Sequence, residues 1–435
     1  MSDRTPPAVR IDTLAKHVGE RVTLEGWLYN KRSSKKIHFL EVRDGTGIVQ
    51  CVLASSDVDA AAFESAGTAG QESSLRVTGT VRAEPRAKGG HEIHADGFEL
   101  IQNAVDYPIT PKEHGVAFLL EQRHLWLRSR RTHAILRVRA ELQRAIADYF
   151  DAEGYMRLDT PILTPAACEG TTTLFETDYF EEKAYLAQSG QLYGEAGAMA
   201  FGRIYTFGPT FRAEKSKTRR HLMEFWMIEP EAAFLDHEGN IALAEGLICA
   251  MVQRALERCR PELQILERDT SKLEAIVRPF PRLGYTQAVE QLRSQGFEVA
   301  HGDDFGAEHE TALASTYDRP LVVDRYPASL KPFYMKKDPA NPSLVLNMDL
   351  LAPEGYGEIV GGSVREEDPG VLDQQIADKG VDPAPLEWYR ELRRYGTVPH
   401  AGFGLGLERS IAWICGLDHL REAIPFPRLM GRLHP

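Results

Sequence analysis

Residues 211–231 read FRAEKSKTRRHLMEFWMIEPE, and this stretch decides how the second half of the chain is built. The residues from 205 to 214 and those from 221 to 231 are each typical of a strand. The basic loop at 215–220 lies between them and joins the two strands into a hairpin. Neighbouring strands connected by such a short loop pair in the antiparallel sense.

The hairpin gathers side chains that are unusual for a protein core. Side chains alternate between the two faces of a strand, so we expect His221, Phe225 and Glu229 on one face. With Arg212 close by, such a face suits a nucleotide. Arginine clamps phosphate oxygens, phenylalanine stacks on a base, and histidine donates to a phosphate oxygen. The alternation alone leaves a second interpretation open, an exposed charged hairpin without a ligand.

A glycine-rich motif near the C-terminus points to the same chemistry. Residues 400–409 read HAGFGLGLER and lead into a helix that we expect to end at Gly416. Glycine weakens a strand unless another group must approach the backbone closely. A flat base lying on Gly404 and Gly406, with Arg409 reaching back, explains the pattern. The motif lacks the downstream acid of a dinucleotide-binding fingerprint, and no glycine-rich loop ends in a Walker lysine.

A third motif, DLLAPEGYGEIVGGSVR at residues 349–365, contains acids that suit a metal ion. Asp349 and Glu358 offer carboxylate oxygens, the ligands that Mg²⁺ prefers and that ATP chemistry requires. Two surface acids beside a loop are the alternative interpretation of this motif.

The residues from about 9 to 104 read as short strands separated by turns. Alternating stretches lie at 22–28, 48–53 and 75–81. Several short strands within about a hundred residues are typical of a small closed barrel. The Ala-, Ser- and Gly-rich stretch at 55–74 is expected to cross the barrel as a helix or a loop.

Beyond the barrel the periodicity becomes helical. Prolines at 108 and 111 indicate a linker. Apolar residues recur at helical spacing from about 132 to 151, Gly154 ends this helix, and a short strand at 155–159 follows. The stretch from about 236 to 330 mixes helical patterns with polar loops and is the least informative part of the chain.

Length, composition and charge limit the class of protein. With 435 residues, 43% hydrophobic and 26% charged, the chain is expected to form two domains of an ordinary globular protein. The formal net charge of −12 argues against non-specific coating of nucleic acid but leaves room for an RNA partner bound by local basic groups. The scattered cysteines form no CxxC pair, so neither a zinc site nor a disulfide framework is expected. No run is apolar and long enough to span a bilayer, and a reducing cytoplasm is the expected location.

Taken together and in this order, the motifs resemble those of class II aminoacyl-tRNA synthetases. The hairpin at 211–231 resembles motif 2, and Gly404 to Arg409 resembles motif 3. The helix and strand at about 132–161 resemble motif 1, the element through which this family forms homodimers. The resemblance implies an α+β fold whose catalytic domain has a central antiparallel sheet flanked by helices. The expected division is a barrel domain at 1–105, a hinge at 106–125 and a catalytic domain at 126–435, with a poorly assigned insertion at about 261–330.

An N-terminal barrel resembles the aspartate, asparagine and lysine subgroup, in which a five-stranded OB-fold reads the anticodon. The run IHFLEVRDGTGIVQ at 37–50 is similar to that subgroup. The resemblance implies that Phe39 stacks on an anticodon base, that Gln50 hydrogen-bonds to its edge, and that Arg32 contacts a phosphate or base. Stacking on an unpaired RNA base contributes ~1–3 kcal/mol. A barrel-core position is the alternative for Phe39.

The string QSGQLYGE at 188–195 separates the members of the subgroup. Aspartyl enzymes resemble it but have proline in place of Gly190 and lysine in place of Gly194, where the lysine pairs with the substrate carboxylate. A neutral amide needs no such cation, which would stay buried and unpaired. The string therefore resembles that of the asparaginyl enzymes. An aspartyl enzyme, discriminating or not, and an asparagine-synthesising paralogue of the synthetases are the alternatives.

The resemblance further implies that the chain uses ATP and Mg²⁺ to join L-asparagine to tRNA(Asn). Arg365 is expected to donate to the side-chain amide oxygen and Glu229 to accept from the amide nitrogen, so that aspartate would set its carboxylate against Glu229. The expected amino-acid-binding residues are Glu169, Ser189, Gln191, Arg212, Glu229 and Arg365. The expected ATP-binding residues are Arg212, Glu214, His221, Phe225, Glu358, Gly404, Gly406 and Arg409. Of these, Arg212, His221 and Arg409 are expected to be catalytic by charge stabilisation and positioning, and Asp349 and Glu358 to hold the metal.

Overall fold

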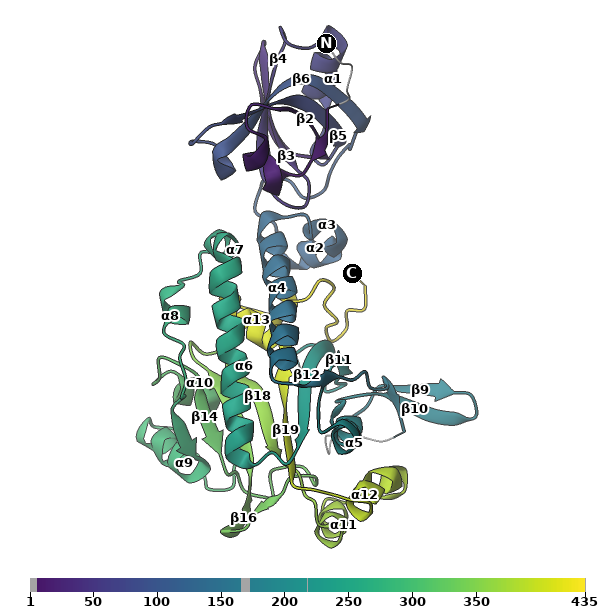
Figure 1. Cartoon of the computed structure of the whole chain (residues 1–435), viewed down its shortest axis with the longest axis vertical. Helices are drawn as coiled ribbons and strands as arrows, with labels where there is room; N and C mark the ends of the chain where they lie inside the picture. Colours follow the sequence, from purple (N-terminus) through teal and green to yellow (C-terminus); the bar gives the residue numbers. More distant parts are fainter. Residues whose placement is uncertain (1–5, 166–172, 217, 435) are drawn as a thin grey trace. The chain divides into compact units, whose positions relative to one another are not determined.

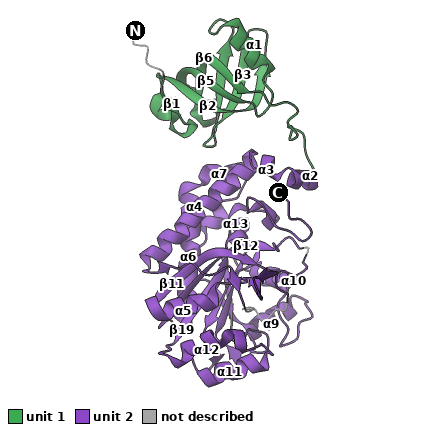
Figure 2. Cartoon of the chain, turned by 90° about the vertical axis from the view of Figure 1, so that its right-hand side faces the viewer, with its two compact units in different colours: residues 1–115 green, residues 116–435 purple. Residues whose placement is uncertain are grey.

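The computed structural model describes residues 6–165, 173–216 and 218–434. The chain divides into two compact units, residues 1–115 and 116–435 (Figure 2). Residues 106–115 carry no helix or strand. The next residues, which we had assigned to the hinge, form the short helices α2 (Val116–Glu121) and α3 (Arg123–Trp126) of the second unit.

The first unit is the five-stranded closed barrel that the sequence predicts. Its five long strands are β2 (Arg21–Ser33), β3 (Ile37–Arg43), β4 (Ile48–Ala54), β5 (Ser74–Ala83) and β6 (His91–Gln102). They follow the order β2-β3-β4-β6-β5, and pairing of β2 with β5 closes the barrel. The short β1 (Ala8–Val9) adds to β2 in parallel. The 3₁₀-helices η1 (Ile11–His17) and η2 (Lys88–Gly90) and the α-helix α1 (Ala60–Thr68) complete the unit.

Every second side chain of the strands points into the barrel, and these side chains form its core. On β3, Leu40 and Val42 are fully buried, and on β4 the same holds for Cys51 and Leu53. Phe39 belongs to the opposite face of β3, is half-buried, and lies outside the apolar cluster of the barrel. The side chain expected to read the anticodon is therefore not part of the packed core.

The second unit is built on one eight-stranded sheet of order β13-β14-β17-β18-β19-β12-β11-β7 (Figure 1). Its strands are β7 (Met156–Arg157), β11 (Arg203–Phe211), β12 (Glu224–Ala233), β13 (Arg282–Gly284), β14 (Leu321–Asp324), β17 (Asn347–Ala352), β18 (Gly357–Val364) and β19 (His400–Gly406). Neighbouring strands are antiparallel, apart from the parallel pairs β7–β11 and β13–β14 at the two edges. The predicted antiparallel sheet is confirmed.

Three helices cover one face of this sheet: α4 (Arg130–Ala152), α6 (His237–Arg258) and α13 (Leu407–Cys415) (Figure 1). The hydroxyl of Ser129 accepts from the Thr132 backbone N–H and begins α4, close to the predicted start. Val138, Leu142 and other buried residues of α4 pack with α6 and α13 in one apolar cluster. As predicted, α13 ends before Gly416, which has the left-handed conformation that favours glycine.

The remaining elements surround the other parts of the sheet. The helices are α5 (Gln191–Phe201), α7 (Arg260–Ile265), α8 (Ser271–Glu274), α9 (Tyr285–Ser294), α10 (Ala307–Ala314), α11 (Pro369–Asp378), α12 (Glu387–Arg394), η3 (Ala384–Leu386) and η4 (Leu420–Glu422). The small strands are β8 (Leu163–Thr164), β9 (Glu176–Tyr179), β10 (Glu182–Leu186), β15 (Lys337–Asp338) and β16 (Asn341–Val345). In the stretch that the sequence left unassigned, α9 and α10 pack with β13 and β14, the last two strands at this side of the sheet, around an apolar cluster of their own.

The hairpin around the basic loop differs from the prediction on both sides of the loop. Strand β11 ends at Phe211, whereas we expected it to continue to Glu214. Strand β12 begins at Glu224, whereas we expected a strand from His221. The chain turns away earlier because the Met223 N–H donates to the Arg428 carbonyl at 2.9 Å and Leu222 is buried in the core. His221 therefore lies in the loop and does not alternate with Phe225. Within the described ranges, no helix is both apolar and long enough to cross a membrane.

Candidate active site

The open face of the central sheet carries the side chains of the three motifs. Ile228 and Leu405 pack in the core formed with the covering helices. The residues directly before and after them on each strand point to the opposite face of the sheet. Thus Phe225, Met227 and Glu229 of β12 share this open face, as the sequence predicts for Phe225 and Glu229.

Two glycines of β19 lie directly under side chains of β12. A Cβ atom at Gly404 would come within 2.4 Å of the Met227 methyl carbon, and one at Gly402 within 2.3 Å of the Glu231 carboxyl carbon. At Gly406 the nearest atoms would belong to Arg409 at 3.7 Å, an ordinary contact. Glycine at 402 and 404 thus allows close packing within the sheet face, whereas Gly406 lies against Arg409 with no close contact.

A pocket of about 660 Å³ opens on this face between β12, β18 and β19. It is lined by Arg212, Glu214, Arg220, His221, Leu222, Met223, Phe225, Met227, Glu358, Ile359, Gly404, Gly406, Glu408, Arg409 and Leu420. The lining includes every residue that we expected to bind ATP. Three motifs far apart in the sequence therefore meet in one cavity.

Arg212 lies in this pocket with capacity to bind an anion. Its guanidinium carbon is 5.4 Å from the centroid of the Phe225 ring. Its Nε atom is buried, and among the described residues no acceptor lies within hydrogen-bonding distance. A buried donor without an acceptor costs about 1–3 kcal/mol, which a bound phosphate or carboxylate oxygen would recover.

Arg409 is fixed by the strand beside it. Its Nη1 donates to the backbone carbonyl of Glu358 at 2.8 Å and lies 3.4 Å from the side-chain carboxylate of the same residue. The preceding residue, Glu408, accepts from Arg139 of α4 at 2.7 Å and from the Trp226 N–H at 2.9 Å. These bonds tie α13 to both α4 and the hairpin, and so hold Arg409 at the pocket.

His221 faces the two arginines from the loop. Burial, and then the positive charges of Arg409 and Arg212, lower the pKa of His221 below its ordinary value. The ring is therefore neutral near pH 7 while no anion occupies the pocket.

Acidic groups meet on the β17–β18 side of the pocket. A Cβ atom built on Gly361 would lie 2.8 Å from Glu358 Oε1 and 3.7 Å from Asp349 Oδ1, so these two oxygens face one space. The second oxygen of each carboxylate has a cationic partner. Lys331 donates to Asp349 Oδ2 at 2.7 Å, and Arg409 lies near Glu358 Oε2. Burial raises the pKa of Asp349, and the charge of Glu358 adds to this effect against the opposing charge of Lys331.

This donor set fits a hard cation that also binds phosphate. Two carboxylates with further ligands from a nucleotide are the usual environment of Mg²⁺. Among the described residues, no group of three or more His, Cys, Asp and Glu side chains is arranged to hold a metal ion by itself. The pair Asp349 and Glu358 therefore fits an ion that depends on the phosphates of its substrate.

Further along β12, Glu229 is held by a set of donors. The hydroxyl of Thr206 donates to it at 3.1 Å and the backbone N–H of Gly190 at 2.8 Å, and the Ser189 hydroxyl also donates. These bonds fix the position of the carboxylate. They bring Ser189 and Glu229, both expected to bind the amino acid, into contact.

Arg365 has a protein partner that the sequence did not indicate. It forms a bidentate ion pair with Glu231 and donates to Ser363 at 2.8 Å. The register explains the pairing, because Glu231 and Ser363 lie on either side of Gly402 on neighbouring strands. Glu231 was missed, although it follows Glu229 by two residues on the same face.

A buried cluster of charged and polar residues beside Gln191 was also missed. Glu195 of α5 bonds to Gln191, and Tyr389 and Arg393 of α12 and His400 of β19 all approach the same carboxylate. The four-residue spacing of Gln191 and Glu195 is the one signal in the sequence, since it places both on one face of a helix. Glu169, also expected to bind the amino acid, lies outside the described residues.

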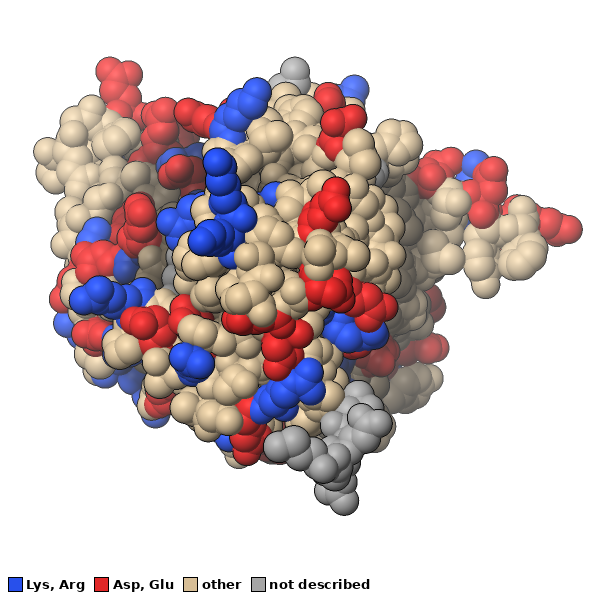
Figure 3. Space-filling view, turned by 90° about the horizontal axis from the view of Figure 1, so that it is seen from above, with Lys and Arg blue, Asp and Glu red and all other residues tan. Residues whose placement is uncertain are grey.

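The barrel has a hollow of its own. It is lined by Arg32, Glu41, Ile48, Gln50, Glu84, Arg86, Ala87 and Glu92. The Arg32 guanidinium carbon is 5.9 Å from the Phe39 ring centroid, so the three residues expected to read the anticodon lie on one side of the barrel. Lys31, by contrast, donates to backbone carbonyls at the end of α1, including Ala69 at 2.7 Å. On the face drawn in Figure 3, Lys and Arg gather in small groups between Asp and Glu.

Comparisons with known proteins agree with this geometry. The family model described as tRNA synthetases class II (D, K and N) matches residues 116–430. The model described as an OB-fold nucleic acid binding domain matches residues 22–101. The two matched regions fall within the two compact units.

Relatives match over nearly the full length. An asparagine–tRNA ligase of Desulforamulus reducens is 58% identical over 422 residues, covering 97% of this chain and 98% of the relative. One of Sorangium cellulosum is 56% identical over 442 residues, covering 99% of each chain. The crystal structure of asparaginyl-tRNA synthetase from Pyrococcus horikoshii complexed with asparaginyl-adenylate is 45% identical, with a TM-score of 0.95 over 98% of this chain and 99% of that one. The chain therefore belongs to the class II tRNA synthetases of the D, K and N group and, within it, to the family of asparagine–tRNA ligases.

Proposed function

We propose that this protein activates L-asparagine with ATP and transfers it to tRNA(Asn). The observation that carries the proposal is the single pocket in which Arg212, His221, Phe225 and Arg409 converge, with the Arg212 Nε lacking an acceptor among the described residues. The pocket suits a triphosphate and an adenine ring, and the resolved relative from Pyrococcus horikoshii holds an asparaginyl-adenylate.

The reaction needs no nucleophile from the protein. The carboxylate of asparagine attacks the α-phosphorus of ATP, the bond to the β-phosphate oxygen breaks, and pyrophosphate leaves. The 3′-terminal ribose hydroxyl of the tRNA then attacks the adenylate carbonyl and AMP leaves. Arg212 holds the reacting carboxylate and α-phosphate together, while Arg409 and His221 stabilise charge on the leaving phosphates. Phe225 stacks on the adenine, and Glu214 accepts from its amino group.

Asp349 and Glu358 would hold Mg²⁺ through the two oxygens that face Gly361. The ion supplies charge neutralisation at the phosphate oxygens when it is bound. Lys331 and Arg409 orient these carboxylates by binding their other oxygens.

Selection of asparagine over aspartate depends on polarity, because the two side chains have the same shape. Glu229, held in place by Ser189, Gly190 and Thr206, accepts from the side-chain amide nitrogen and repels a carboxylate. Arg365 donates to the amide oxygen while Glu231 balances its charge. A side chain at Gly194 would meet the Glu231 Cγ atom at 3.2 Å, so the lysine of aspartyl enzymes would disturb this pair.

The barrel is proposed to read the anticodon through Arg32, Phe39 and Gln50.

We also propose that two copies associate through α4 and the segment after it, where Met156, Ile162 and Leu163 are 40%, 45% and 40% exposed. Burial of such apolar side chains favours a homodimer. The expected location is the cytoplasm, where the tRNA is.

The test is amino-acid-dependent exchange of pyrophosphate into ATP. Asparagine is expected to support exchange, and aspartate at the same concentration is expected to give only background. Equal or faster exchange with aspartate would refute the selection by Glu229 and Arg365. Failure of both amino acids would refute the proposed reaction itself.

A further inference from the structure

The side chain of Gln191 is held in one orientation by a buried carboxylate. Its amide nitrogen lies 3.1 Å from Glu195 Oε1. A carboxylate accepts hydrogen bonds but does not donate them, so the atom facing Glu195 must be the NH₂ group. The carbonyl oxygen of the same amide therefore points the opposite way. Gln191 begins α5, and Glu195 lies one turn later on the same face.

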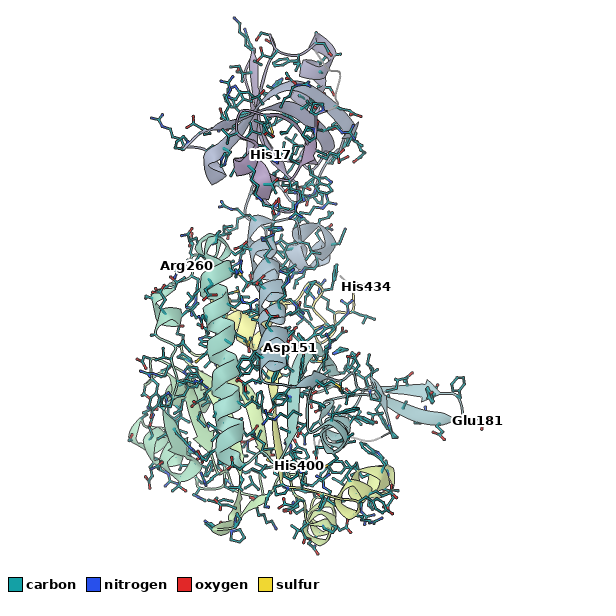
Figure 4. The ribbon with its side chains drawn as sticks, viewed as in Figure 1. His17, Asp151, Glu181, Arg260, His400 and His434 are labelled. Carbon is teal, nitrogen blue, oxygen red and sulfur yellow. The ribbon has the colours of Figure 1, made fainter. Side chains whose placement is uncertain are left out.

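Glu195 is in turn fixed by three donors from the C-terminal part of the chain. Its Oε2 atom accepts from Arg393 at 2.6 Å, from His400 at 2.9 Å and from the Tyr389 hydroxyl at 2.9 Å. Tyr389 and Arg393 are one turn apart on α12, and His400 begins β19 (Figure 4). Glu195, Tyr389 and His400 are fully buried.

The surroundings keep this carboxylate charged. Burial disfavours the ionised form, but Arg393 and the hydrogen bond from His400 outweigh burial and hold the pKa of Glu195 well below its ordinary value. The Arg393 Nε also donates to the Glu366 carbonyl at 2.9 Å, and His400 Nδ1 lies 2.8 Å from the Val398 carbonyl, so neither donor is free to turn away. These bonds hold the Glu195 carboxylate in one geometry.

We propose that Glu195 is a positioning residue for recognition of the amino acid: it turns the Gln191 carbonyl oxygen toward the α-ammonium of asparagine, and Arg393, Tyr389 and His400 hold it in place. This inference rests on the proposed function, because it takes Gln191 as a contact of the substrate ammonium. The proposal goes further, because it assigns the orientation of the Gln191 amide to residues that do not touch the substrate. Through Glu195, the side chains of α12 and β19 decide whether the oxygen or the nitrogen of this amide faces the ligand.

The variant Glu195→Gln tests the proposal because it keeps the shape of the side chain. Arg393, His400 and Tyr389 would take the single carbonyl oxygen of the new amide, leaving its NH₂ group facing Gln191. Gln191 must then turn over and present its own NH₂ to the substrate ammonium. We expect the KM for asparagine in pyrophosphate exchange to rise by about ten- to a hundredfold, with the KM for ATP unchanged, because a charged hydrogen bond is lost.

Succinamate, which is asparagine without its ammonium group, separates positioning from general damage. As a competitive inhibitor against asparagine, it is expected to bind the wild-type protein and Glu195→Gln equally well. The double variant Gln191→Glu with Glu195→Gln is expected to restore asparagine affinity. In it, the carboxylate introduced at position 191 accepts from the amide introduced at position 195 with one oxygen and offers the other to the ammonium. Glu391→Gln makes the same change at an exposed position of α12, outside the cluster, so it is the matched control and should leave the KM unchanged.

An unchanged KM for asparagine in Glu195→Gln would overturn the proposal, and so would an equal loss of asparagine and succinamate affinity. If Glu195→Gln does not fold, Arg393→Met takes its place and is expected to raise the KM for asparagine alone. A parallel loss of succinamate affinity in that variant would equally overturn the proposal. The proposed function fails separately, if the wild-type protein gives no exchange with asparagine.

Discussion

The ATP end and the amino-acid end of the open sheet face hold their charges in opposite ways. At the ATP end, Arg212 has a buried donor without an acceptor among the described residues, and the pKa of His221 is lowered by burial and by the arginines beside it. At the amino-acid end, Arg365 is paired with Glu231 and Arg393 with Glu195. The ATP end therefore offers a buried arginine donor to an anion, while Arg365 and Arg393 at the amino-acid end are paired before any ligand binds.

The difference reflects what each end must recognise. A triphosphate brings several negative charges, so unpaired donors at its site gain a strong interaction on binding. Asparagine has a neutral side chain, and only fixed donors and acceptors can separate it from aspartate. A balanced cluster holds those groups still without attracting a charged competitor.

The largest effect is expected from removing the buried arginine donor at the ATP end. Arg212→Met should lower the rate of asparagine-dependent exchange by about 10²–10³-fold, the usual loss when one group that stabilises developing charge is removed. Arg203→Met on the same hairpin is the control, because Arg203 stacks on Tyr155 away from the pocket. Exchange rates measured at saturating ATP would show whether only the first variant fails, and similar losses in both would remove the assigned role of Arg212.

The next effect concerns the balance at the amino-acid end. Gly194→Lys would add a cation beside Glu231 that competes with Arg365, and its Cβ atom would lie 3.2 Å from the Glu231 Cγ atom. Loss of a paired buried charge costs about 3–5 kcal/mol, so we expect the KM for asparagine to rise by two orders of magnitude or more. Gly194→Ala adds the crowding without the charge and should cost less. If both variants raise the KM equally, steric fit and not charge explains the glycine.

Much of the ATP end could be predicted from the sequence because its residues lie in short contiguous motifs. Alternation along one strand was enough to place Phe225 and Glu229 on one face, and the glycine pattern was enough to locate Arg409. The prediction that His221 lies in the strand and shares a face with Phe225 was wrong. The chain turns before β12, and this turn depends on a hydrogen bond to Arg428, which is far away in the sequence.

The amino-acid end was harder to predict because its partners come from distant segments. Arg393 and Glu195 are 198 residues apart, and nothing in the local pattern of either indicates the pairing. Buried charges require partners, but only the packing of α12 against α5 decides which ones meet. For the same reason the ion pair of Arg365 with Glu231 was missed, since it depends on the register of neighbouring strands.

A smaller effect is expected in the barrel, which contributes to neither end of the pocket. Phe39→Ala should lower tRNA charging by about ten- to a hundredfold, since stacking on one RNA base contributes ~1–3 kcal/mol. Adenylate formation, measured by pyrophosphate exchange, should not change. Phe63→Ala, at a residue that stacks on His38 and packs against the barrel core, is the stability control. An equal fall in the free energy of unfolding for both variants would make Phe39 a core residue and not a reader of RNA.

The smallest effect is a change in how ATP affinity depends on pH. Burial and the charges of Arg409 and Arg212 lower the pKa of His221 in the free protein, and a bound triphosphate cancels part of that charge and raises it. Because the complex then binds the proton more tightly, ATP affinity should rise as pH falls through the pKa of the complex, by at most about tenfold per pH unit.

In His221→Asn this rise in ATP affinity should be lost, so that only the pH dependence caused by protonation of ATP itself remains. His419→Asn should behave like the wild type, because burial lowers the pKa of His419 to about 4. Calorimetric titration with ATP at several pH values measures the difference, and parallel slopes for His221→Asn and the wild type would exclude His221 as a proton-linked phosphate contact.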